Sequence, residues 1–258
     1  MRHEKTLSNW LFFTAFMVFA MAIIGAITRL TESGLSMVEW RPLIGTIPPL
    51  SEAEWTRVFN IYRETPEYQL KNAGMDLEGF KEIFFWEWFH RVWGRLIGLV
   101  YGLPLLFFWL RGMIPKGWGW PLFGLLVLGG AQGVMGWYMV ESGLVDRPSV
   151  SHYRLAAHLG LAAIIFCLLL AAGFAMRTGK RAQFSLPITL GFAAVIPAFI
   201  WGAFVAGLDA GLVYNEFPHM GQGRLVPEEF ALSGQPWWVM VLGDPVGVQF
   251  THRWLAIG

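Results

Sequence analysis

Charged residues are scarce in this sequence, and cysteine is almost absent. Asp, Glu, Lys and Arg make up 14% of the 258 residues, whereas a typical soluble domain carries about 25%. The formal net charge is only +1, which removes any general electrostatic attraction to nucleic acid. A single cysteine, Cys167, excludes an intramolecular disulfide and a thiolate zinc site within this sequence. A soluble enzyme and a nucleic-acid-binding protein are therefore both disfavoured.

Hydrophobic residues, in contrast, make up 55% of the sequence and lie in long runs. A membrane-spanning helix needs about 20 mostly apolar residues, because lipid offers no partner for backbone polar groups. Five segments suit such spans: 6–28, 88–110, 117–140, 155–176 and 182–208. A sixth apolar segment, 250–258, is the start of another. The 14 Trp residues suit ring anchors at membrane interfaces. We predict an all-α integral membrane protein.

The loops between these spans differ in charge. Segments 1–5, 111–116 and 177–181 together hold seven basic residues and one acid. Loop 29–87 holds ten acids and six bases, and loop 209–249 holds five acids and one base. Basic loops stay on the cytoplasmic side, so the N-terminus is predicted to be cytoplasmic and the long loops to face outward. The expected location is a bacterial inner membrane, or the mitochondrial inner membrane in a eukaryote.

An internal repeat relates the two halves of the sequence. Residues 25–35 resemble residues 202–212 at a constant offset of 177. The long loop after each copy ends in a similar phrase, Glu-Trp-Phe-His-Arg at 87–91 and Gln-Phe-Thr-His-Arg at 249–253. A parallel duplication of a four-helix unit explains these matches. The alternative is a chance likeness between apolar helices that share Gly and Ala.

The duplication predicts tandem four-helix bundles. The first bundle is expected in residues 1–183 and the start of the second in residues 184–258. The second bundle is therefore expected to be incomplete in this chain, with two further spans belonging beyond Gly258.

Three histidines, His90, His158 and His252, lie in the predicted spans that run from the outer side inward. Each is expected about one turn inside its span, so the three imidazoles lie at similar depth. Two imidazoles on facing helices can bind the iron of a haem from its two faces, whereas zinc prefers three or four ligands. The alternative is a set of interfacial histidines bonded to the backbone. His152 and His219 are expected in outer loops.

Glu87 precedes His90 by three residues, which places both side chains on one helix face. The second copy has Gln249 at this place, and an amide cannot ionise. The difference predicts that the first site performs chemistry while the second passes electrons. The alternative is that Glu87 caps the start of its helix, where the helix dipole favours a carboxylate.

Arginines and glycines accompany these residues. Arg91 and Arg253 follow the histidines and suit either the carboxylates of a haem or lipid headgroups. Gly129 and Gly133 have the spacing of close helix packing, so a porphyrin or a neighbouring helix fits against them. That helix belongs either to the same chain or to another copy in a homo-oligomer.

Several phrases together are similar to the haem A synthase family, especially to its alphaproteobacterial and mitochondrial branch. They are residues 25–37, 87–91, 132–144 and 154–159. The resemblance covers nearly the whole chain. It implies an eight-helix protein of two four-helix bundles, an oxidoreductase that converts the C8 methyl group of haem O to a formyl group. The product is haem A for cytochrome oxidase.

The resemblance also assigns roles to residues. Glu87, His90 and His158 would belong to the substrate-haem site, with Glu87 as the catalytic group and the histidines as iron ligands. His252 would be one axial ligand of a haem b, and the histidine that pairs with it is expected beyond the chain's last residue. Candidate partners are the haem O synthase and an electron-transfer protein. The alternatives are a dihaem b-type electron-transfer subunit and a haem-handling assembly protein.

Overall fold

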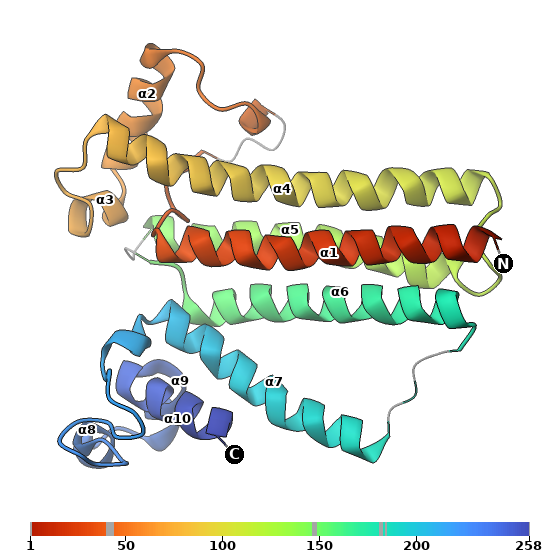
Figure 1. The fold of residues 1–258 in the computed structure, drawn as a ribbon. Coiled ribbons are helices and arrows are strands. Elements are labelled where there is room, and N and C mark those ends of the chain that lie inside the picture. The colour runs from red at the N-terminus through yellow and green to blue at the C-terminus, as the bar shows by residue number, and fades with distance from the viewer. Residues whose placement is uncertain (1, 40–43, 146–148, 181–182, 184, 258) are drawn as a thin grey trace. The chain divides into compact units, whose positions relative to one another are not determined.

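The computed structural model describes residues 2–39, 44–145, 149–180, 183 and 185–257, and every regular element within them is helical (Figure 1). The long helices are α1 (Arg2–Leu30), α4 (Leu77–Leu110), α5 (Gly119–Val145), α6 (His152–Thr178) and α7 (Leu186–Gly207). The short ones are η1 (Ile44–Thr46), α2 (Glu52–Arg63), α3 (Pro66–Leu70), η2 (Ala210–Leu212), α8 (Glu228–Leu232), α9 (Trp237–Gly243) and α10 (Pro245–Ile257).

The five long helices contain segments long and apolar enough to cross a membrane, and no other helix among the described residues does. This result confirms the prediction of an all-α integral membrane protein with five complete spans. The described residues do not include positions 181, 182 and 184. These positions belong to the predicted basic loop, the predicted start of the fifth span and the expected boundary between the bundles.

Helix α4 begins at Leu77, so the predicted start near Trp88 is wrong. The Asp76 side chain caps the helix by accepting a hydrogen bond from Gly79 N at 2.9 Å. The added turns are held in place because Phe80 and Phe84 are buried against aromatic residues of α2 and α3. Charged residues in these turns interrupt the apolar run, which is why the sequence pattern concealed this part of the helix.

The chain divides into two compact units, and the first comprises Met1–Ser149 and Leu161–Ala182. In it α1, α4, α5 and the C-terminal part of α6 lie side by side (Figure 1) and share one apolar core. Side chains also bond to the backbone of neighbouring helices. Trp10 Nε1 donates to Val100 O at 2.9 Å, and Tyr101 Oη donates to Leu122 O at 2.8 Å. These contacts lie toward the N-terminal end of α1, which leaves the opposite end for the site.

A small aromatic cluster lies at one end of the first unit, on α2, α3 and the start of α4, and is called the outer cluster. Tyr62 and Phe80 are fully buried there. Glu67 is also buried, and its carboxylate accepts a hydrogen bond from Tyr62 Oη at 3.1 Å. Burial raises the pKa of Glu67 to about 8. The loop after α1 therefore folds into a packed cap rather than an open connection.

The second unit comprises Val150–Gly160 and Gln183–Gly258, and α10 packs along α7 within it. His152 is the first residue of α6 and is buried, with its Nε2 3.0 Å from Leu242 O. The prediction of a loop position for His152 is therefore wrong, because this end of α6 packs under α9. His219 lies in an exposed loop, as predicted.

Candidate functional site

Glu87 is held from two sides in the first unit. Its side chain is 3% exposed. One carboxylate oxygen, Oε2, accepts hydrogen bonds from Ser36 Oγ and from Met37 N, both at 2.7 Å. The other oxygen, Oε1, accepts a bond from Arg91 at 2.5 Å. Because both oxygens are engaged, the carboxylate is fixed in position on α4.

Arg91 joins this carboxylate to the segment that follows α1. Its guanidinium bonds both Glu87 Oε1 and the carbonyl oxygen of Met37, the latter at 3.0 Å. The backbone N–H of Met37 bonds the opposite oxygen of the same carboxylate. Glu87 and Arg91 therefore bind Met37 from both sides, one at its backbone N–H and the other at its carbonyl oxygen. Since Asp76 caps α4, the alternative of Glu87 as the helix cap is wrong.

His90 lies one turn farther along α4 and faces α1. A Cβ atom added at Gly25 would lie 3.2 Å from His90 Cε1, so the imidazole edge occupies the space that the glycine leaves. His90 lies about three and a half turns after the start of α4 rather than one. His90 is thus farther from the start of its helix than expected, because α4 continues into the outer cluster; its depth in the membrane stays a prediction.

The second unit repeats this arrangement with different chemistry. Gln249 is 4% exposed, and its Nε2 donates to Tyr214 O at 2.9 Å. Arg253 donates to the same carbonyl oxygen at 2.5 Å. Tyr214 stands 177 residues after Met37, the repeat offset. A glutamine and an arginine here both donate to the carbonyl oxygen of the residue that corresponds to Met37.

The backbone repeats as well. Glu32 and Asp209, again 177 apart, both have a left-handed φ of 51°, a conformation uncommon for residues other than glycine. The glycine contact recurs, since a Cβ added at Gly202 would lie 3.2 Å from His252 Cε1. Chance likeness between apolar helices does not explain matching turns, hydrogen bonds and histidine contacts. The two copies therefore share a backbone frame.

The buried imidazoles fit the binding of a haem iron. Nδ1 of His252 is buried and has no hydrogen-bond partner in the described part of the chain. Nδ1 of His90 is also buried. Among the described residues, no group of three or more His, Cys, Asp and Glu side chains suits a metal ion held by protein alone.

The remaining candidates are placed as follows. His158 lies on the N-terminal part of α6, which belongs to the second unit, whereas His90 belongs to the first. In α5, a Cβ added at Gly129 or Gly133 would meet no described atom within 4 Å. Close packing of a helix within the first unit is therefore not the reason for these glycines. Arg253 also donates to His219 O at 3.0 Å.

Sequence reasoning missed the residues that hold the carboxylate. Ser36 and Met37 lie in one of the phrases quoted for the family, yet no role was predicted for them. The repeat offset offered a signal, because it pairs Met37 with Tyr214. Nothing in the pattern shows that the segment after α1 folds back onto α4.

The chain is similar to known proteins over nearly its whole length. Residues 8–258 match the family model COX15-CtaA, described as cytochrome oxidase assembly protein. The chain is 51% identical to haem A synthase of Rhodospirillum centenum over 98% of this chain and 69% of that protein. It is 48% identical to haem A synthase of Agrobacterium fabrum, over 98% of this chain and 70% of the relative.

A third relative, haem A synthase of Nitrosospira multiformis, is 45% identical over 98% of this chain and 73% of its own length. No solved structure matches the chain. The family model and these relatives cover nearly every described residue, the two repeated sites included. The chain belongs to the COX15-CtaA family of cytochrome oxidase assembly proteins.

Proposed function

We propose that this protein is a haem A synthase, an oxidoreductase that converts the C8 methyl group of haem O to the formyl group of haem A. The observation that carries the proposal is the buried carboxylate of Glu87, fixed one turn from His90 on the same face of α4. The haem A synthases of the relatives, at 45–51% identity, support the substrate and product.

In the proposed substrate site, His90 would hold the iron of haem O, and Glu87 is the catalytic group at the methyl carbon; the role of His158 as an iron ligand stays a prediction. Ser36 and Met37 keep the carboxylate aimed in one direction, while Arg91 offsets its charge. A carboxylate held in this way can accept a proton, and return it as the carboxylic acid, without reorienting. Arg91 has further N–H groups, and we assign it to the haem carboxylates as well.

In the proposed second site, His252 would hold the iron of a haem b, and Arg253 follows it in the sequence. A haem bound there supplies one-electron transfer. Gln249 occupies the place of Glu87 but has no ionisable proton, so this copy serves electron transfer only. The proposed division is a substrate-haem bundle in residues 1–183 and a haem b bundle beginning at residue 184.

The proposed setting is the inner membrane, with the N-terminus in the cytoplasm. The excess of basic residues in the short loops supports this orientation. This orientation places the outer cluster of α2 and α3 on the side of the membrane opposite the cytoplasm. Haem O synthase and an electron-transfer protein are the proposed partners, and a homo-oligomer is compatible with the open glycine face of α5.

The test is to express the protein in cells that make haem O but lack haem A, and then to identify the haems extracted from their membranes. Haem A is expected only when the protein is present. A dihaem electron-transfer subunit or a haem-delivery protein would bind haem and leave haem O unchanged. Bound haem without haem A would therefore overturn the proposal.

A further inference from the structure

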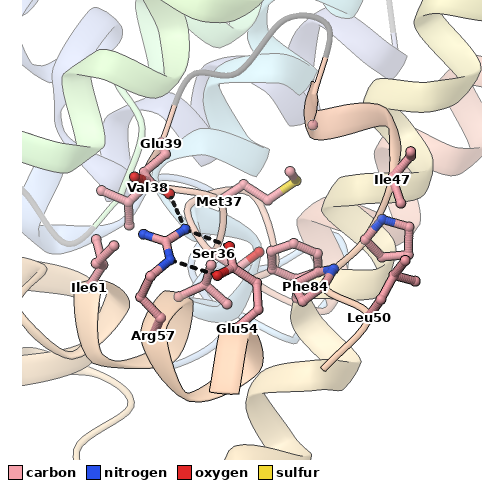
Figure 2. A pocket seen from close by; sticks show the side chains of 14 residues that line it. Ser36, Met37, Val38, Glu39, Ile47, Leu50, Glu54, Arg57, Ile61 and Phe84 are labelled. Carbon is pink, nitrogen blue, oxygen red and sulfur yellow. Dashed lines mark hydrogen bonds and ion pairs between the residues drawn. The ribbon is translucent and has the colours of Figure 1, made fainter. Parts of the chain in front are cut away.

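A cavity of about 280 Å³ lies in the outer part of the first unit, between α2, the start of α4 and the segments beside η1. Its walls are mostly apolar, and Figure 2 shows Phe84, Ile47 and Leu50 along one side of it. Val58 and Ile61 of α2 also line the cavity. A space of this size and character suits a flexible hydrocarbon chain rather than a polar molecule.

The cavity shares a wall with the proposed catalytic carboxylate. Ser36 and Met37 both line it, and the same two residues donate hydrogen bonds to Glu87 Oε2. Phe84 lines it too and precedes Glu87 by three residues on α4, so both lie on one helix face. A single layer of residues therefore separates the cavity from the carboxylate.

The charged groups of the cavity are already paired with one another. Arg57 bonds Glu39 at 2.7 Å and Glu54 at 2.8 Å, as the dashed lines in Figure 2 show. Arg57, the one cation among the described residues that line the cavity, is therefore engaged by two carboxylates. An anionic group such as a haem propionate is disfavoured there, whereas a neutral apolar chain meets no electrostatic penalty.

The substrate of the proposed function carries such a chain. Haem O differs from protohaem by a hydroxyethylfarnesyl tail at C2, on the pyrrole ring next to the ring that bears the C8 methyl group. A porphyrin with its C8 methyl group at Glu87 therefore presents the root of the tail to the same side. The cavity is the apolar space adjoining Glu87 on that side.

We propose that this cavity receives the isoprenoid tail of haem O and so selects haem O over protohaem. The inference rests on the proposed function, because it takes haem O as the substrate. Tail burial in the cavity would also set the rotation of the porphyrin about its iron, with the C8 methyl group kept at the carboxylate.

The test compares the affinity of the full-length purified protein for haem O and for protohaem, measured by the change in Soret absorbance. Val58→Phe fills the cavity, and it is expected to weaken haem O binding about tenfold, equivalent to ~1.4 kcal/mol. Protohaem binding should change by less than about twofold. The matched control is Val195→Phe, at an exposed position of the span α7, which should change neither affinity.

A second measurement uses the unaltered protein and so does not depend on the folding of a variant. Free farnesol should compete with haem O and leave protohaem binding unchanged. If Val58→Phe keeps the preference for haem O, or if farnesol does not compete, the tail binds elsewhere and the proposal is wrong. Bound phospholipid that Val58→Phe displaces without altering the haem preference would identify a lipid chain as the occupant and likewise overturn it.

These outcomes remain distinct from a failure of the proposed function. A protein that makes no haem A disproves the synthase proposal whatever its haem preference. A protein that makes haem A, yet binds haem O no better than protohaem, retains the synthase proposal and loses only the tail site.

Discussion

At position 87 a carboxylate accepts hydrogen bonds from the backbone N–H of Met37, whereas at position 249 an amide donates to the carbonyl oxygen of Tyr214. The arginine one turn later bonds the carbonyl oxygen of that residue in both units. The two units thus hold a side chain at the same place with opposite hydrogen-bond polarity. The same position thus holds an ionisable carboxylate in the first unit and a neutral amide in the second, and only the carboxylate can exchange a proton near neutral pH.

The largest effect is expected from Glu87→Gln, which gives the first unit the side chain of the second. Haem A formation should fall by about 10²–10⁴-fold, the usual contribution of a general acid or base. Haem binding should persist because the glutamine oxygen still accepts from Met37. Haem extraction measures the first effect and Soret absorbance the second.

The control for this change is Glu82→Gln, an exposed glutamate on the same helix. It should leave haem A formation unchanged. Undiminished haem A yield from Glu87→Gln would remove the carboxylate from the chemistry.

The next comparison concerns two Tyr–Glu pairs. Glu67 is buried under Tyr62, and burial raises its pKa from 4.5 to about 8. Glu229 is exposed, and the hydrogen bond from Tyr214 lowers its pKa. The protonated form of Glu67 stabilises the fold. This stabilisation is complete below pH 4.5 and is lost as the pH rises through about 8.

Glu67→Gln should therefore remove a fall in stability between these pH values. At 1.36 kcal/mol per pKa unit, the free energy of unfolding of the parent should fall by a few kcal/mol between pH 4.5 and pH 9 because of Glu67. The variant should not show this fall. Chemical unfolding in detergent at the two pH values measures the effect. Glu229→Gln should not reproduce it, and equal pH profiles for the parent and Glu67→Gln would contradict the prediction.

A smaller effect is expected from Ser36→Ala, which removes one of the donors to Glu87. Hydrogen bonds to charged groups contribute about 1.5–3 kcal/mol, but Met37 and Arg91 still hold the carboxylate. Haem A formation should fall about tenfold, and Ser36→Thr should restore it because it keeps the hydroxyl group. Equal losses in both variants would point to packing instead of hydrogen bonding.

The smallest effects should come from Gly25→Ala and Gly202→Ala. Each added Cβ lies 3.2 Å from a histidine Cε1, so the imidazole must shift by a few tenths of an ångström. Each change should move the absorbance or EPR signal of the haem bound at its own histidine and leave the other haem unaltered. Gly98→Ala, in open space on α4, should alter neither signal. Equal effects on both haems would show that the two frames are not independent.

The parts of this fold that depend on hydropathy and repetition were predictable from the sequence. Long apolar runs determine the spans, since lipid leaves the backbone no alternative to a helix. The similar motifs at 87–91 and 249–253 led to the pairing of His90 with His252. The structure adds a shared glycine contact and a shared turn at Glu32 and Asp209. Similar sequences in the two copies adopt similar backbone conformations, because the same local interactions form in each.

The contacts across the chain were not predictable in this way. Neither the bonds from Ser36 and Met37 to Glu87 nor the burial of Glu67 leaves a periodic signal. They arise when the segment after α1 and the helices α2 and α3 fold onto α4. Similarly, His152 reads as a polar loop residue until α9 covers it.

Helix α4 is continuous from the outer cluster into the span. Phe84, Glu87 and His90 follow one another along α4 at intervals of three residues. A wall of the cavity, the carboxylate and the proposed iron ligand therefore belong to one rigid rod, the helix itself. Their separations cannot change unless that rod bends. A thermal displacement of α4 would carry all three together, so recognition of the substrate and alignment of its reacting carbon would stay in register while the surrounding bundle fluctuates.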